Sequence, residues 1–120
     1  MIVCVATHYE GDPCDNTKKF TKWIKELRRT KQTDIFKGMK FVMFGLGDTS
    51  YEQYNFMGKY FSEAFEELGG EKLYKYGEAN AEGNKTEDDF NEWKFNLWKE
   101  VFDYYHVNET LEEKQISLVN

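Results

Sequence analysis

The sequence contains no apolar run approaching the roughly 20 residues that span a bilayer. Its first apolar residues, Met1 to Ala6, have no basic segment ahead of them, so they do not resemble a signal peptide. Charged residues make up 32% and aromatic residues 18% of the 120 residues, a balance that speaks against disorder. We therefore expect a folded chain with one core.

Cysteine and histidine are also scarce. The two cysteines, Cys4 and Cys14, lack the CxxC spacing of redox or zinc sites, which favours two reduced thiols in a reducing compartment. His106 has no second histidine or cysteine at ligand spacing, so no metal site is predicted. The sequence carries no P-loop or Ser-His-Asp signature, and a hydrolase therefore has no support.

The formal net charge is -6. Phosphate recognition needs clustered lysine and arginine, so this balance disfavours nucleic acid as the partner. A basic protein is a better match for it.

Apolar periodicity predicts three successive units of strand, loop and helix. The strands are expected at 1–7, 41–44 and, with a weaker alternation, 72–76; the helices are expected at 17–29, 57–68 and from Thr86 to about Tyr104. The unbroken first run predicts a central strand buried on both faces. Alternating strands and helices predict an α/β fold with a doubly wound parallel sheet, and the tryptophans and phenylalanines of the helical apolar stripes are assigned to its core.

Ligands of open parallel sheets bind beyond the carboxyl ends of the strands. The loops 7–16, 45–55 and 77–84 should therefore meet at one edge. They carry four aromatic side chains that favour stacking on a planar ligand: His8, Tyr9, Tyr51 and Tyr54. They also carry an acidic fringe: Glu10, Asp12, Asp15, Asp48, Glu52, Glu78 and Glu82. Solvated acids and packed tyrosines are an open alternative, under which the pattern predicts only an α/β domain.

Two of these loops resemble known motifs. Residues 6–16, Ala-Thr-His-Tyr-Glu-Gly-Asp-Pro-Cys-Asp-Asn, and residues 44–55, Phe-Gly-Leu-Gly-Asp-Thr-Ser-Tyr-Glu-Gln-Tyr-Asn, resemble two segments of the diflavin reductases, and most closely those of NADPH-haemoprotein reductases. The likeness covers nearly the whole chain. It implies the later part of a flavodoxin-like FMN-binding domain, truncated to about three strands and three helices.

The resemblance also implies a function and a set of ligand residues. FMN would receive electrons that come from NADPH through FAD, both bound on parts absent from this chain, and would pass them singly to a haem protein. Tyr51 matches the tyrosine that stacks on the flavin ring. The other cofactor-binding residues implied are Thr7, His8, Tyr9 and Gly11 along the ring, and Gly47, Asp48 and Asn55, which shape the loop of Tyr51. The family usually faces the cytoplasm from the endoplasmic reticulum.

The chain departs from the family in three places. His8-Tyr9 replaces a Tyr-Gly pair, so either Tyr9 takes over the second stacking position or that face of the site is degraded. Asn80-Ala81-Glu82 replaces an acidic run, which removes the aspartate associated with electron transfer. The two strands and the phosphate loop that open the family's domain are expected to be absent, which leaves the first strand with an uncovered edge.

We therefore expect residues 1–106 to form a partial FMN-binding domain and residues 107–120 a linker-like tail. One hypothesis makes the chain part of a working oxidoreductase whose missing half completes the FMN site. The alternative is a structural or interaction piece that binds no flavin and whose sheet edge is covered by a neighbouring chain.

Overall fold

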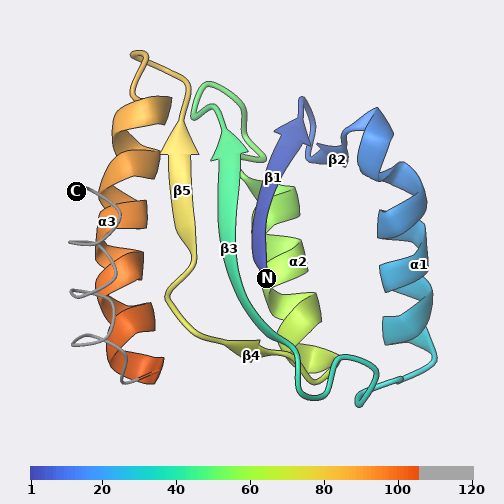
Figure 1. Ribbon diagram of the computed structural model, residues 1–120. Helices are drawn as coiled ribbons and strands as arrows, with labels where there is room; N and C mark the ends of the chain where they lie inside the picture. The colour runs from blue at the N-terminus through green and yellow to red at the C-terminus, as the bar shows by residue number, and fades with distance from the viewer. Residues whose placement is uncertain (106–120) are drawn as a thin grey trace.

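Strands and helices alternate along the chain in the computed structural model, which describes residues 1–105 (Figure 1). The strands are β1 (Ile2–His8), β2 (Asp12–Pro13), β3 (Lys40–Gly47), β4 (Glu71–Lys72) and β5 (Gly77–Asn80). The helices are the 3-10 turn η1 (Asp15–Thr17), α1 (Lys18–Arg29), α2 (Phe56–Glu67) and α3 (Thr86–Tyr105). The predicted tail, 107–120, and His106 lie outside the described residues.

The sheet is mostly parallel, with β3 at its centre. β1 pairs in parallel with one edge of β3, in a register that places Ile2 opposite Val42. β5 pairs in parallel with the end of β3, where Phe44 lies opposite Gly77. The short β4 pairs with the start of β3, and β2 folds back antiparallel on the end of β1. The predicted α/β fold is thus confirmed.

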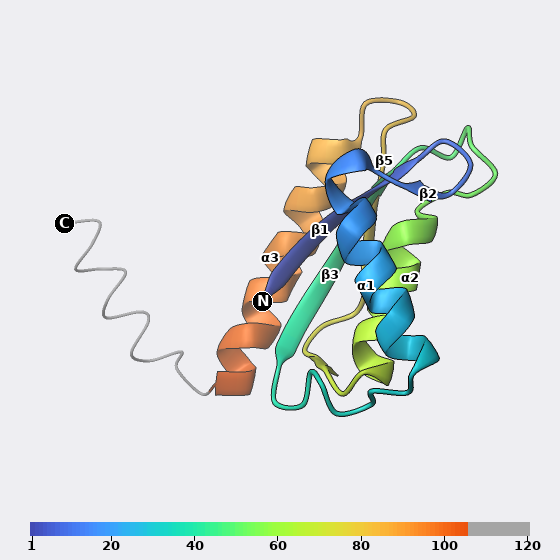
Figure 2. The ribbon, with the colours of Figure 1, turned by 90° about the vertical axis from the view of Figure 1, so that its right-hand side faces the viewer.

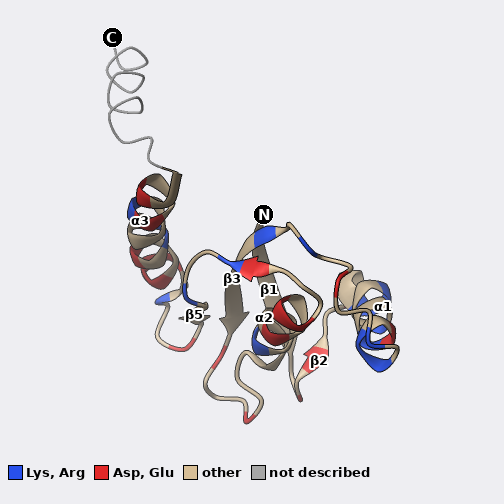
Figure 3. Ribbon diagram, turned by 90° about the horizontal axis from the view of Figure 1, so that it is seen from below, with Lys and Arg blue, Asp and Glu red and all other residues tan. Residues whose placement is uncertain are grey.

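Alternate residues of β3 face two separate cores. Phe41 and Met43 pack with the buried residues of α1 and α2, among them Ile24 and Phe65. Val42 and Phe44, on the opposite face, belong to a smaller cluster with Ala79, Trp93 and Leu97. Seen from below, α1 and α2 lie on one side of the sheet and α3 on the other (Figure 3). This arrangement confirms the doubly wound prediction.

The third strand lies later in the chain than predicted. The expected strand at 72–76 was wrong; only Lys72 of that range is in β4, and β5 occupies Gly77–Asn80, which was assigned to a loop. Packing explains the shift, because a Cβ atom on Gly77 would lie 2.4 Å from Cδ1 of Trp93. Trp93 Nε1 also donates a hydrogen bond to the carbonyl oxygen of Lys75, 3.1 Å away. Trp93 thus packs where only a glycine fits in the strand and is hydrogen-bonded to the segment that precedes it.

β1 is not buried on both faces, contrary to the prediction. Ile2 is 53% exposed and Cys4 is also exposed, although Val5 is buried. Within residues 1–105, β1 pairs along its length only with β3, and the second edge is covered by β2 only at Thr7 and His8. The uncovered edge that the resemblance implied is therefore present in the described part of the chain.

Two aromatic residues of α1 were assigned to the core wrongly. Trp23 is 45% exposed and Phe20 is 39% exposed, whereas Phe61, Phe65 and Trp93 are buried as predicted. The two exposed rings lie at the margin of the α1 and α2 packing, where Trp23 meets the ring of Phe36. No helix within residues 1–105 has both the length and the apolar character needed to cross a membrane.

Candidate functional site

The loops that follow β1, β3 and β5 all lie at the same end of the sheet, as predicted (Figure 1). The backbone N–H of Ala81 in the third loop donates to the carbonyl oxygen of Gly47 in the second, 2.7 Å away. A Cβ atom on Gly11 in the first loop would lie 3.0 Å from Cβ of Gln53 in the second. The second loop therefore contacts both of its neighbours.

An open hollow of about 320 Å³ lies between these loops. Its walls come from all three of them and from the start of α3: Thr7, Leu46, Gly47, Asp48, Tyr51, Ala81 and Thr86. Tyr51 is 44% exposed, so its ring can be contacted by a ligand. Leu46 and Ala81 give the hollow apolar walls, and a flat aromatic ligand could pack against them and against the tyrosine ring.

His8 and Tyr9 form the rim of the first loop. Tyr9 has a backbone φ of 34°, in the left-handed region that favours glycine, as expected where the family has that residue. Its ring contacts the ring of His8 edge-on, with 4.0 Å between centroids. It also lies 5.8 Å from the ring of Tyr51, at an interplanar angle of 70°. Two rings so close and so tilted leave no slot for a planar group between them, so the space beside Tyr51 is the hollow.

Asn55 lies beneath the loops. Its side chain is fully buried, its backbone φ is 54°, and its Nδ2 donates to the carbonyl oxygen of Ala79 at 3.4 Å. A Cβ atom on Gly47 would lie 2.5 Å from Asn55 Oδ1, and one on Gly45 would lie 3.0 Å from it. These glycines therefore make room for the asparagine, and Asn55 supports the second loop from below without lining the hollow.

Thr7 and Asp48 are held by specific hydrogen bonds. The Met57 N–H, at the start of α2, donates to Thr7 Oγ1 at 3.0 Å. Asp48 Oδ1 accepts from the Ser50 hydroxyl at 2.6 Å and from the Ser50 N–H at 2.8 Å. These two bonds stabilise the carboxylate and lower the pKa of Asp48 below its ordinary value. Asp48 is thus an anion at the lip of the hollow.

Asn80 connects two loops, and sequence reasoning missed this role. Its Oδ1 accepts from the Thr49 N–H and from the Glu82 N–H, both at 3.0 Å. Its Nδ2 donates to Thr49 Oγ1 at 2.8 Å, and that hydroxyl bonds in turn to the Glu82 carboxylate. Nothing in the local pattern around Asn80 signals a bond to a residue 31 positions away. The departure from an acidic run at this point is the signal that could have drawn attention to it.

The predicted residues thus occupy four kinds of position. Thr7, Gly47, Asp48 and Tyr51 line the hollow; His8 and Tyr9 form its rim; Gly11 contacts the second loop; Asn55 is buried below. Leu46, Ala81 and Thr86 line the hollow as well but were not predicted. The role of each predicted residue in holding a cofactor stays a prediction.

The residues around the loops are mainly acidic, and lysines pair with two of these acids. Lys18 pairs with Asp15 at 2.8 Å and Lys59 with Glu78 at 3.5 Å. The residues that line the hollow include one acid, Asp48, and no cation. The hollow is therefore suited to a neutral ring and not to a phosphate group.

Comparisons with known proteins identify relatives of this chain. The family model described as Flavodoxin matches residues 1–93. NADPH–cytochrome P450 reductase from Rattus norvegicus is 38% identical over 117 residues, which is 97% of this chain. The reductase of the same description from Dictyostelium discoideum is 39% identical over 95% of this chain. The chain spans only 16% of the rat protein and 17% of the Dictyostelium protein.

Solved structures give the same result. A cysteine-to-serine mutant of flavodoxin from Pseudomonas aeruginosa has a TM-score of 0.65 and 25% identity, covering 82% of this chain and 64% of that one. Flavodoxin 1 from Bacillus cereus has a TM-score of 0.55 at 21% identity and supports the fold. The family match, the reductase relatives and these structural neighbours together support FMN as the cofactor.

Proposed function

The chain belongs to the flavodoxin family, and from this premise we propose that it is the FMN-binding electron-transfer module of an NADPH-dependent diflavin reductase. When bound, FMN would supply the redox chemistry, taking electrons from FAD and passing them one at a time to a haem protein. The observation that carries the proposal is the hollow beside Tyr51, built at the carboxyl ends of three parallel strands.

In this proposal the chain's own residues bind and orient the flavin ring. Tyr51 stacks on one face of the ring, while Leu46 and Ala81 exclude water from its edge. Asp48 places a fixed negative charge at the lip, which disfavours additional negative charge on the ring. The phosphate of FMN needs cations, hydroxyls or backbone N–H groups other than those that line the hollow.

The proposed partner is a basic haem protein. Its attraction would come from the acidic fringe, where Glu10, Asp12 and Glu52 are exposed around the rim of the site. Complementary charge mainly raises the rate of association, so electron transfer to a haem protein should slow as salt concentration increases. The cytoplasmic face of the endoplasmic reticulum is proposed as the compartment on the same family grounds.

The Tyr51→Ala variant tests the ring site directly. Loss of one stacking ring should weaken FMN binding by roughly 1 to 3 kcal/mol, the scale for an aromatic side chain on a planar base. Titration of the protein with FMN, followed by quenching of flavin fluorescence, measures the change. Tyr104→Ala is the matched control, because Tyr104 is also 44% exposed but lies at the far end of α3. Equal affinities for the two variants would remove Tyr51 from the site.

A second function has its own supporting observation. Four large apolar side chains of β1 and α3 are exposed: Ile2, Phe95, Trp98 and Tyr105. Such a surface is typical of an interface. The chain could thus serve as an interaction piece, with a neighbouring chain covering this edge and no flavin bound. A purified chain that takes up no FMN, alone or with that partner, would favour this second function.

A further inference from the structure

The cations of this chain are unevenly distributed. Seven of its 16 lysine and arginine residues stand between Lys18 and Lys31, with Glu26 as the one acid in that stretch. The chain as a whole nevertheless carries a net charge of -6. Figure 3 shows the same concentration in space, with the blue of lysine and arginine gathered on α1. α1 is therefore a basic element in an otherwise acidic protein.

Helical spacing places four lysines on the solvent side of α1. Ile24 and Leu27 point inward and are buried. Lys18, Lys19, Lys22 and Lys25 are exposed, and we name these four residues the lysine stripe. Figures 1 and 2 show α1 at the side of the molecule away from α3, with nothing from the described chain in front of it.

The lysine stripe is not explained by the stability of α1. The first turn of the helix carries no acid, and Lys18 and Lys19 lie at its positive end, where the helix dipole disfavours cations. Lys18 and Lys22 are four residues apart and Lys22 and Lys25 three apart, spacings at which like charges repel. These interactions lower the stability of the helix. An anionic partner outside the described chain would offset the repulsion among the lysines.

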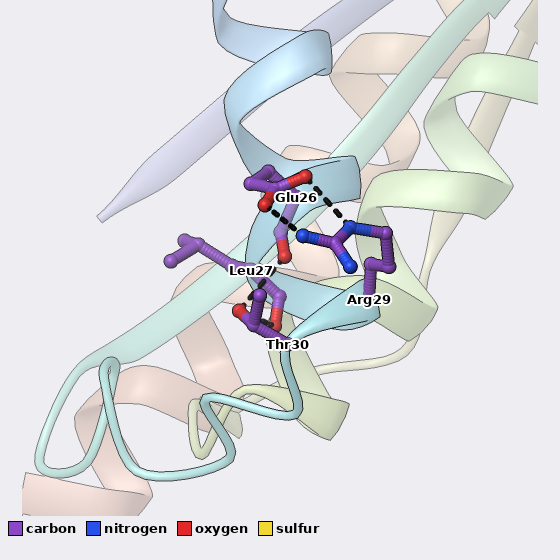
Figure 4. Close-up of polar contacts among 4 residues, drawn as sticks. All are labelled: Glu26, Leu27, Arg29 and Thr30. Atoms are coloured by element: carbon purple, nitrogen blue, oxygen red, sulfur yellow. Dashed lines mark hydrogen bonds and ion pairs between the residues drawn. The ribbon is translucent and has the colours of Figure 1, made fainter.

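The arginines of the helix are already paired. Arg29 forms a two-bonded contact with Glu26, with Nε to Oε2 at 2.9 Å, at the end of the helix where the Thr30 hydroxyl also donates to the Glu26 carbonyl oxygen (Figure 4). Arg28 binds Glu67 of α2 at 2.6 Å. Within the stripe, Lys18 pairs with Asp15. Lys19, Lys22 and Lys25 make no ion pair with any residue in 1–105.

Exposed apolar side chains border the lysine stripe. Trp23 is 45% exposed, Phe20 is 39% exposed, and Ile35, in the segment after the helix, is 47% exposed. Trp23 and Phe20 are in ring contact with each other, with 5.7 Å between centroids. Tryptophan beside lysine is favoured at the level of lipid headgroups, where the ring and the charge each find a suitable environment.

We propose that the exposed face of α1 docks on an anionic lipid surface through the lysine stripe, with Trp23 at headgroup depth. Two features favour lipid over an acidic protein or a nucleic acid. The unpaired cations are all lysines, whose compact charge suits a diffuse anionic surface, whereas paired recognition of carboxylates or phosphates favours arginine. The exposed rings add apolar surface, which headgroups accommodate. This docking is independent of flavin binding.

Sedimentation with vesicles tests the proposal on the full chain. We expect binding to phosphatidylcholine vesicles that contain phosphatidylserine, weak binding to pure phosphatidylcholine, and release at high salt. The Lys22→Gln, Lys25→Gln double variant should lower the partition coefficient about thirtyfold, from the free energy expected per lysine. Lys75→Gln, Lys85→Gln is the matched control, since it removes the same charge from exposed sites beyond α1. It should change binding far less.

Three results would contradict the proposal that α1 docks on anionic lipid. These are equal binding to both kinds of vesicle, an equal loss in the two double variants, and binding to a duplex oligonucleotide without binding to vesicles. Trp23→Phe gives a second readout, because the blue shift of tryptophan emission on adding anionic vesicles should shrink in this variant. Circular dichroism of each variant establishes that it is folded. These outcomes do not depend on whether the chain binds FMN in the titration.

Discussion

The two faces of the sheet are covered very differently. On one face, covered by α1 and α2, the side chains of Ile24, Phe61 and Phe65 are at most 1% exposed. On the other face α3 alone covers the sheet, and Phe95 and Trp98 on the same helix are 62% and 41% exposed. The first face is a complete core within the described residues. The second is a core only where Trp93 and Leu97 meet β3 and β5, and beyond that it is an open apolar surface.

The largest effect should come from the complete face. Phe65→Ala removes a ring that contacts Phe41, Phe36 and Phe61, and the resulting cavity should lower the free energy of unfolding by about 3–5 kcal/mol. Urea denaturation measures it. Phe95→Ala, the same change on the open face, should stay within about 0.5 kcal/mol. If the two losses were similar, the contrast between the faces would be wrong.

The next effect concerns the covered part of the second face. Gly77→Ala should cost roughly 1–3 kcal/mol, because the added methyl would overlap Trp93 and approach Phe44 to 2.8 Å. Combining it with Trp93→Phe should give a loss smaller than the sum of the two single losses, since the smaller ring makes room. Thermal unfolding of the four proteins measures this coupling. Simple additivity would show that Gly77 is not confined by the tryptophan.

A smaller effect on stability, with a different readout, is expected from the open part of that face. Phe95→Ser should change the free energy of unfolding by no more than about 0.5 kcal/mol, and Trp98→Ser by about 1 kcal/mol, because Phe95 is 62% exposed and Trp98, at 41%, is partly covered. The double variant should self-associate less, since it breaks up an apolar surface. Sedimentation velocity measures the association. A large loss of stability would mean that the rings are buried in solution.

The smallest effect should come from the loop edge, which neither core covers. Ser50 lowers the pKa of Asp48, so the carboxylate contributes stability that is present above the ordinary value of 3.8 and is lost as the pH falls through the lowered pKa. Asp48→Asn should therefore flatten the acid limb of the stability curve slightly. Glu52→Gln, an exposed acid of the same loop, is the control. A flattening as large in the control would assign the effect to general charge.

The sequence predicted the fold class, the helices and the meeting of the three loops, because each depends on local periodicity and on the rule for parallel strands. It misplaced the third strand, since Gly77 and Asn80 are poor strand formers and Trp93 decides their position through packing. It assigned Trp23 to the core because helical spacing identifies the apolar face of α1 but not how far the neighbouring elements cover that face. The position of Tyr51 at the hollow was predictable from a motif. The hydrogen bonds between Asn80 and Thr49 were not, because they join residues 31 positions apart.

The hydrogen bonds of Asn80 link two loops at a position where the family has an acidic run. A carboxylate at position 80 could accept hydrogen bonds but could not donate to the Thr49 hydroxyl, whereas the amide does both and so fastens the second loop to the third. These bonds restrain the two walls of the hollow relative to each other. A planar molecule entering it would meet a gap whose width is set in advance, so little ordering would be needed on arrival and less of the binding free energy would be lost to it.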